Sequence, residues 1–297
     1  MVSMAKRTDA GSSDAPRSPY RPHPTFAVDN GDLLIQSSDS VLFGVHSCIL
    51  MMASPVFQAS LATPPSSPAT PGSILVRQPL VLSEPAYVID SLLHFMYPLP
   101  APTFDNLSAL TKVLAASVEY DVSIATTALR KQLISPHFLS SEPLRVFAIA
   151  CRFGFKNEAS EASNATLSIN LLDAPLIEEL KYVSAYDYHR LLSLHSTRGR
   201  AARKVLSLRA KTCPARCGGC SYSVLGEQAV LPRWWYSFEK RAKDELERRP
   251  LTDIIFSMRF LSECVGCPSC GGSILDSYHF MESLKAELDA LPDRITD

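Results

Sequence analysis

The sequence has no segment that marks a secreted or membrane-spanning protein. Residues 1–27 are polar and rich in proline and serine, and they lack the apolar core of a signal peptide. No apolar run comes near the roughly 20 residues that cross a bilayer. The formal net charge of −1 gives no overall attraction to nucleic acid or to a membrane surface. We therefore expect an intracellular chain with no membrane or nucleic-acid partner, and the choice between nucleus and cytoplasm stays open.

Glycine is scarce, and this excludes several common enzyme classes. The chain has 12 glycines, and two stand side by side only at 218–219 and 271–272. Neither pair belongs to a phosphate-binding glycine loop, and no Gly-x-Ser-x-Gly nucleophile motif occurs. Because no set of nucleophile, base and oxyanion stabiliser can be assembled from the sequence, we expect no catalysis.

Large apolar side chains are few in residues 1–27, so burial cannot offset the entropy lost on ordering them, and we expect a disordered tail.

After it, short strands and helices alternate. Residues 32–38 and 41–46 are predicted strands of one hairpin, because a turn signal separates two apolar runs. Ser54 and Pro55 mark a helix start, since serine caps helices and proline suits their first position. The other expected elements are a helix over 47–53, a proline-rich loop over 62–73, a strand over 80–82 and helices over 84–97, 107–118 and 122–134.

This order of elements carries residues similar to those of BTB/POZ domains. The run Val45–Phe57 resembles the end of the second strand and the helical pair of that family, with Asp32 before the first strand. Met96–Pro98 and residues 118–122 resemble its later helix ends. The resemblance extends to the version found in mushroom-type (basidiomycete) fungal proteins, where a run similar to Pro143–Gly154 follows the domain.

The resemblance implies a protein–protein interaction module that forms homodimers or recruits partners and, in some members, serves as substrate adaptor for a cullin-type ubiquitin ligase. Two features depart from the family pattern. Ser47 stands where many BTB dimers carry a basic residue that faces the aspartate, and the 62–73 loop has no acidic residue where ligase adaptors often carry an apolar-x-Glu motif. Met51 and Met52 fit a core or a dimer face, His46 a hydrogen-bonded hinge, and Cys48 and Cys151 buried apolar positions.

The middle of the chain, residues 137–197, is predicted to be a helical extension. Apolar residues recur at helical spacing from Leu144 to Cys151, and further helices are expected over 159–169, 177–182 and 186–194, with Asp173 and Pro175 at a helix start. Eight lysines and arginines and no acidic residue lie between Tyr188 and Gly226. They form either a nuclear-import or nucleic-acid patch or a solvated helix face, and their dispersed spacing favours the helix face.

Six of the eight cysteines lie in two clusters of the C-terminal region, residues 198–297. The Cys-x-x-Cys spacing lets two thiolates of one turn reach the same metal, and two such turns supply a tetrahedral zinc site. The intervening residues predict helices over 234–249 and 251–261, and a helical hairpin would bring the two turns together. We therefore predict a structural Zn²⁺ held by Cys217, Cys220, Cys267 and Cys270.

Several alternatives to this metal site stay open. Cys213 or Cys264 could replace one of the four ligands, or the clusters could form a redox dithiol or remain reduced thiols without metal. A catalytic zinc would need an open position and a neighbouring acid or base, and nothing in the sequence places Glu263 or His279 at the metal.

The predicted fold class is therefore α+β: a BTB/POZ-like domain, then a mostly helical extension and a Cys-rich helical C-terminal region. The expected boundaries are 1–27 for the tail, 28–136 for the domain, 137–197 for the extension and 198–297 for the Cys-rich region. The predicted function is that of a non-catalytic interaction scaffold. The alternatives are a cullin-type ligase adaptor and a nuclear transcription regulator with a zinc-stapled C-terminal region.

Overall fold

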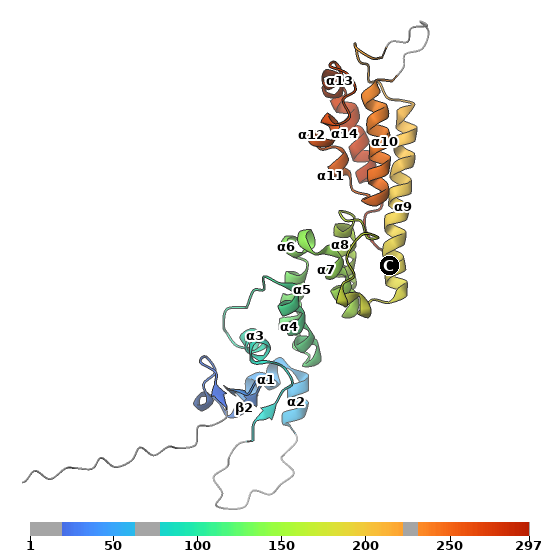
Figure 1. Ribbon diagram of the computed structural model, residues 1–297. Helices are drawn as coiled ribbons and strands as arrows, with labels where there is room; N and C mark the ends of the chain where they lie inside the picture. Colours follow the sequence, from blue (N-terminus) through green and yellow to red (C-terminus); the bar gives the residue numbers. More distant parts are fainter. Residues whose placement is uncertain (1–19, 63–77, 222–230, 297) are drawn as a thin grey trace, which may run out of the picture. The chain divides into compact units, whose positions relative to one another are not determined.

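The computed structural model describes residues 20–62, 78–221 and 231–296, which fall into two units (Figure 1). Unit 1 comprises residues 1–132 and unit 2 residues 133–297. Unit 1 combines a small sheet with helices, whereas every regular element described in unit 2 is a helix. This confirms the predicted α+β class. None of the described helices is both long and apolar enough to span a bilayer.

The sheet of unit 1 has four strands in the order β1-β3-β2-β4. Strands β2 (Leu33–Gln36) and β3 (Val41–Val45) are antiparallel and form the predicted hairpin. Strand β4 (Leu80–Val81) adds to β2 in parallel, as the short apolar run before Ser83 predicts. The two-residue strand β1 (Arg21–Pro22) pairs in parallel with β3 and forms the edge of the sheet opposite β4.

Strand β1 lies within the N-terminal tail that we expected to be disordered. Beyond it, the ring of His23 stacks on Phe43 with 4.6 Å between ring centroids, and the side chain of Phe26 is only 5% exposed. This burial offsets the entropy cost of ordering the chain, so the expected disorder does not hold for residues 21–27. The rest of the expected tail, residues 1–19, lies outside the described residues.

The helices predicted in unit 1 are all present, with boundaries that shift by no more than two residues. Ser54 caps α2 as expected, because its Oγ accepts a hydrogen bond from the Phe57 N–H at 3.1 Å. The same hydroxyl donates to the carbonyl of Tyr120, which ties this helix start to the end of α4. The helices are η1 (Val28–Asn30), α1 (Ser47–Ala53), α2 (Pro55–Leu61), α3 (Ala86–Met96), α4 (Leu107–Glu119) and α5 (Ser123–Leu133). The predicted 62–73 loop falls almost entirely outside the described residues.

Unit 2 is built around two long helices, α9 and α10, which lie side by side in opposite directions (Figure 1). The shorter helices α11 to α14 pack beside them, and α6 to α8 precede them in the chain. The elements are α6 (Pro136–Ser141), α7 (Pro143–Arg152), α8 (Lys156–Thr166), η2 (Glu178–Tyr182), α9 (Ala185–Ala210), α10 (Arg233–Arg248), α11 (Thr252–Ile255), α12 (Met258–Ser262), α13 (Cys270–Asp276) and α14 (Tyr278–Asp289).

Helix α9 runs unbroken across the boundary that we expected between residues 197 and 198. No proline interrupts it, and Gly199 lets the two long helices approach closely: a Cβ at this position would lie 2.7 Å from the carbonyl oxygen of Leu246. The helical extension and the Cys-rich region therefore share one helix.

Three other details of unit 2 differ from the sequence prediction. No helix starts at Asp173 and Pro175, because the Asp173 carboxylate instead accepts a hydrogen bond from the Asn170 side chain at 2.6 Å in an irregular segment. The helix expected over 177–182 is a 3₁₀ helix, and the one expected over 251–261 is split into α11 and α12.

The core of the α9–α14 bundle contains both tryptophans of the chain. The side chains of Trp234, Trp235 and Phe238 are 0% exposed. Trp234 Nε1 donates a hydrogen bond to Ser273 Oγ at 2.9 Å, which attaches the start of α10 to α13. Because α13 begins at Cys270, this core contact also positions one of the predicted metal ligands.

Candidate metal centre and interaction surfaces

The first Cys-x-x-Cys segment forms a closed turn after α9. The Ser221 N–H donates to the Cys217 carbonyl at 3.0 Å, and the Cys217 N–H donates to Ser221 Oγ at 2.7 Å. These two bonds hold Cys217 and Cys220 on one tight turn. Ser221 was not singled out by the sequence, although a hydroxyl directly after a Cys-x-x-Cys motif could have suggested this role.

The second segment is a turn that leads into α13. The Cys270 N–H donates to the Cys267 carbonyl at 3.0 Å, so this turn is closed in the same way. One turn of helix further on, Ser273 Oγ donates to the Arg216 carbonyl at 2.6 Å, beside the first segment. Ser273 thus joins the two cysteine turns and also accepts the hydrogen bond from Trp234.

The structure brings the four cysteines together. All four Sγ atoms lie within 4.8 Å of one another, and no other His, Cys, Asp or Glu of the described residues joins this group. The Sγ–Sγ distances are 3.5 Å from Cys217 to Cys267, 3.9 Å from Cys217 to Cys270, 3.7 Å from Cys220 to Cys270 and 3.4 Å from Cys267 to Cys270.

These distances fit a tetrahedral metal site. Ligands about 2.3 Å from a central zinc, at tetrahedral angles, lie about 3.8 Å from one another, close to the four separations given above. A disulfide would instead need an S–S distance of about 2.05 Å. The four cysteines could therefore hold one metal ion, and a set of four thiolates is typical of a closed structural site for zinc.

Hydrogen bonds around the sulfur atoms shift the thiol pKa values. Burial and the neighbouring thiols raise the pKa of Cys220 to about 12, against the opposing N–H of Arg233, which lies 3.3 Å from Sγ. The thiol of Cys270 and burial raise the pKa of Cys267. Burial also disfavours the Cys270 thiolate, but backbone N–H groups, foremost that of Gly266, and the thiols beside it lower its pKa to about 7.

Gly219 lies where the two turns meet. A Cβ at this position would be 3.0 Å from Cys267 Sγ and 3.2 Å from Ser269 Oγ, whereas a Cβ on Gly218 would meet nothing within 4 Å. Of the two glycines between Cys217 and Cys220, only Gly219 therefore lies where a side chain would crowd the second turn.

The remaining candidates near the clusters lie outside the four-sulfur group. Cys213 and Cys264 are buried, burial raises the pKa of both thiols, and Cys264 Sγ donates to the carbonyl of Phe260 at 3.2 Å. Glu263 forms an ion pair with Arg241, and His279 is exposed. Neither of these two residues belongs to the group that could hold a metal.

Most long cationic side chains of the basic segment make contacts within unit 2. Arg198 is 5% exposed and donates hydrogen bonds to the carbonyls of Leu288, Leu291, Pro292 and Pro250. Arg203 and Arg209 form ion pairs with Glu247 and Glu287. These three arginines thus have partners within unit 2, and the interpretation of the segment as a helix face rather than a nucleic-acid patch stays a prediction.

In unit 1, polar contacts hold the start of α1. The Asp32 carboxylate accepts hydrogen bonds from the N–H of Ser47, at 2.7 Å, and from its hydroxyl. The His46 N–H donates to the Tyr97 hydroxyl at 2.8 Å, in keeping with the hydrogen-bonded hinge expected for this residue. Asp32 thus accepts two hydrogen bonds from Ser47, the first residue of α1, and so caps the start of this helix.

A stretch that covers most of unit 1 and the first residues of unit 2 matches a known family. Residues 28–137 match the family described as BTB/POZ domain. Their sheet, helical pair and later helices follow the order that the resemblance implied. Residues 28–137 form a BTB/POZ domain. No curated protein matches the chain.

The BTB/POZ domain exposes apolar side chains on α1. Met52 is 89% exposed, and Cys48, one turn earlier on the same helix, is also exposed. The expectation that Cys48 is buried was wrong, because Leu50 is the only residue of this helix that is buried. Val56, at the start of α2, is 37% exposed.

Proposed function

We propose that this protein is a non-catalytic interaction scaffold. Its BTB/POZ domain mediates self-association or recruits a protein partner, as domains of this family do. The match of residues 28–137 to that family is the observation that carries the proposal. The exposed apolar face of α1, comprising Cys48 and Met52, supports homodimerisation through this domain.

Self-association is tested by light scattering of the full chain at micromolar concentration. We expect the mass of a dimer, and we expect Met52→Glu to shift the equilibrium toward monomer because it places a charge in an apolar interface. Gln58→Glu adds the same charge at another exposed helical position and serves as control. A monomer mass for the unmodified chain at all concentrations would remove the homodimer from the proposal.

Partner recruitment is tested by affinity purification of the tagged chain from its native cells, with partners identified by mass spectrometry. A reproducible partner that Met52→Glu releases and Gln58→Glu retains would support recruitment through this face. Recovery of a cullin would assign the adaptor role, whereas recovery of no partner by a chain that is also monomeric would contradict the scaffold function.

We also propose that Cys217, Cys220, Cys267 and Cys270 bind a structural Zn²⁺ ion that staples the Cys-rich region. Four sulfur atoms at 3.4–3.9 Å and a closed ligand set support zinc over a hard cation, which prefers oxygen ligands. When bound, zinc supplies folding free energy by joining two turns that are 50 residues apart in the chain.

The metal content of reduced protein purified without chelators decides this proposal. We expect one zinc per chain, lost in Cys267→Ser because three thiolates and a hydroxyl bind the ion much more weakly. The matched control is Cys264→Ser, since Cys264 is close in sequence and buried but outside the four-sulfur group. Absence of stoichiometric metal from the unmodified protein, or equal loss from both variants, would count against the site.

A further inference from the structure

The segment 291–296 of unit 2 lies against α8 and α9 as an extended chain. Its side chains alternate between partly buried, at Leu291, Asp293 and Ile295, and exposed, at the residue after each of these. This period of two is that of an extended strand, in which successive side chains point to opposite faces. Between the described residues, no main-chain hydrogen bond involves residues 292–296, so neither a helix nor a sheet holds the segment.

Side chains of α8 bind the main chain of this segment instead. Ser160 Oγ donates to the carbonyl of Ile295 at 2.8 Å, and the N–H of the same residue donates to Ser163 Oγ at 3.0 Å. Asn164 Nδ2 donates to the carbonyl of Asp293 at 3.2 Å. Helix α8 thus binds two carbonyl groups and one N–H group of the segment.

Helix α9 contributes two arginines to the same binding. Arg198 Nη1 donates to the carbonyls of Leu291 and of Pro292, the latter at 3.0 Å. Arg190 Nη2 donates to the carbonyl of Thr296 at 2.5 Å. Together, the two helices bind five of the six carbonyl groups of the segment through side chains. Because every sequence carries the same main-chain groups, contacts of this kind suit any extended peptide, and side-chain contacts then decide which peptide is preferred.

Two polar side chains of the segment also have partners on α8. Asp293 Oδ2 accepts a hydrogen bond from Asn164 Nδ2 at 2.8 Å. Arg294 Nη1 lies 3.3 Å from Glu161 Oε2, and both side chains of this ion pair are nearly half exposed. Such a pair adds little affinity but favours a basic residue over an acidic one at this position.

The third side chain, Ile295, borders a cavity of about 510 Å³ that it does not fill. The other walls come from α7, the start of α8 and the start of α9, and they include Phe147, Ala159 and Tyr186. A cavity of this size has room for an aromatic side chain in place of the isoleucine. The segment therefore uses the polar contacts of its site fully and the apolar contacts only in part.

The α8–α9 surface that holds the segment comprises Ser160, Glu161, Ser163, Asn164, Arg190 and Arg198. We infer that this surface is a recognition site for an extended segment of a protein partner that carries an acidic, a basic and an aromatic residue in succession. The residues 293–295 show the chemistry of this ligand, and they act as an internal competitor that the partner displaces. The surface belongs to unit 2 and shares no residue with the exposed face of α1 or with the four cysteines, so its test is independent of both.

The test measures the binding of a fluorescent peptide to the full chain by fluorescence anisotropy. The probe has blocked ends and the sequence of residues 290–296, with phenylalanine at the position of Ile295. The unmodified chain should bind it weakly, because a tethered segment competes at an effective concentration on the order of 1 mM. Arg294→Glu places a like charge beside Glu161 and should release the internal segment, so the probe should bind at least about tenfold more tightly.

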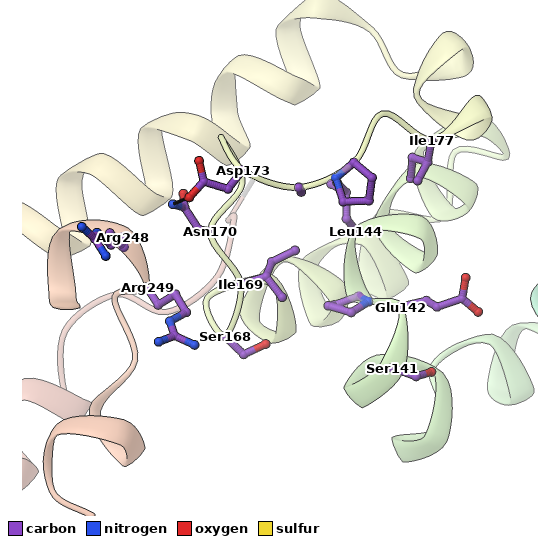
Figure 2. A pocket seen from close by; sticks show the side chains of 13 residues that line it. Ser141, Glu142, Leu144, Ser168, Ile169, Asn170, Asp173, Ile177, Arg248 and Arg249 are labelled. Atoms are coloured by element: carbon purple, nitrogen blue, oxygen red, sulfur yellow. Dashed lines mark hydrogen bonds between the residues drawn. The ribbon is translucent and has the colours of Figure 1, made fainter. Parts of the chain in front are cut away.

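The matched control lies at a second cavity of unit 2, of about 600 Å³ (Figure 2). Arg248 and Arg249 lie on one side of this cavity and Glu142 on the other, and no residue of the segment 291–296 lines it. Arg248 is exposed. Arg248→Glu therefore makes the same change of charge away from the α8–α9 surface, and the probe should bind this variant as weakly as it binds the unmodified chain.

An exchange of charges tests the contacts without relying on a loss of binding. Glu161→Arg should also release the internal segment, because it repels Arg294. This variant should bind a second probe, with glutamate in place of the arginine, at least about tenfold more tightly than the first probe. Tryptophan fluorescence reports whether each variant folds.

Three outcomes would overturn the inference. The first is equal binding of the first probe by Arg294→Glu and by the unmodified chain, and the second is no preference of Glu161→Arg for the second probe. The third is a probe that lowers the mass of the unmodified chain in light scattering, because the occupant of the surface would then be the segment of a second copy.

Discussion

At the scale of single residues, two adjacent glycines of the first cysteine turn differ in what surrounds them. Gly219 lies against Cys267 Sγ and Ser269 Oγ, whereas open space surrounds the Cβ position of Gly218. Their neighbourhoods depend on how the second turn packs, so the sequence alone gives the two residues the same role. The four cysteines, in contrast, follow from their spacing, because two short turns are the simplest way to place four thiols on one ion.

The difference between the glycines leads to a prediction for metal affinity. Gly219→Ala should weaken zinc binding by about tenfold or more, because the new methyl group would force Cys267 away from its position. Gly218→Ala should bind zinc like the unmodified protein. Competition with a chromogenic chelator measures both affinities, and equal affinities would show that the two turns do not meet at Gly219.

At the scale of elements, the partly buried His195 links α8 to α9. The Thr166 hydroxyl donates to the Ser163 carbonyl at 2.6 Å, so its oxygen is left to accept the hydrogen bond from His195 Nε2 at 3.0 Å. This assigns the neutral Nε2–H form to His195. Burial disfavours its protonated form and lowers its pKa from 6.5 to about 4.

The stability of unit 2 should therefore fall at acid pH. The unfolded chain takes up a proton at His195 near pH 6.5, whereas the folded chain does so only near pH 4. The contribution of neutral His195 to the free energy of unfolding is therefore complete above pH 6.5 and is lost as the pH falls toward 4. A pKa shift of this size corresponds to a change of about 3 kcal/mol in the free energy of unfolding.

Urea unfolding between pH 4 and 7, followed by tryptophan fluorescence, measures this effect in unit 2, which contains both tryptophans. His195→Gln keeps a donor to Thr166 but does not titrate, so the free energy of unfolding should depend less on pH than in the unmodified chain. His189→Gln, at an exposed position of the same helix, should behave like the unmodified chain. An unchanged pH dependence in His195→Gln would contradict the assignment.

At the scale of the whole molecule, the chain contains two units with different means of stabilisation. Unit 1 has a sheet covered by helices, whereas the Cys-rich part of unit 2 combines an aromatic core with the candidate metal centre. A ligand that binds only the folded state stabilises it by about 2.7 kcal/mol when its free concentration is 100 times its dissociation constant.

Removal of metal should therefore affect the two units unequally. A strong chelator should lower the unfolding midpoint followed by tryptophan fluorescence, while the part of the circular-dichroism transition that belongs to unit 1 should stay in place. The Cys267→Ser variant should show the lower midpoint without chelator and no further change with it. A tryptophan transition that does not move on chelation would show that no structural metal is bound.

Hydrophobic periodicity, capping residues and proline positions determined the strands and helices of the BTB/POZ domain, because these signals act within a few residues of chain. Cysteine spacing determined the four candidate ligands in the same way. Tertiary structure alone decided that His23 and Phe26 order the chain before the domain, that α9 and α10 approach closely at Gly199, and that Arg198 donates to carbonyl groups near the ends of α10 and α14. Each of these depends on a partner far away in the sequence, and local patterns contain no information about which distant groups a fold brings into contact.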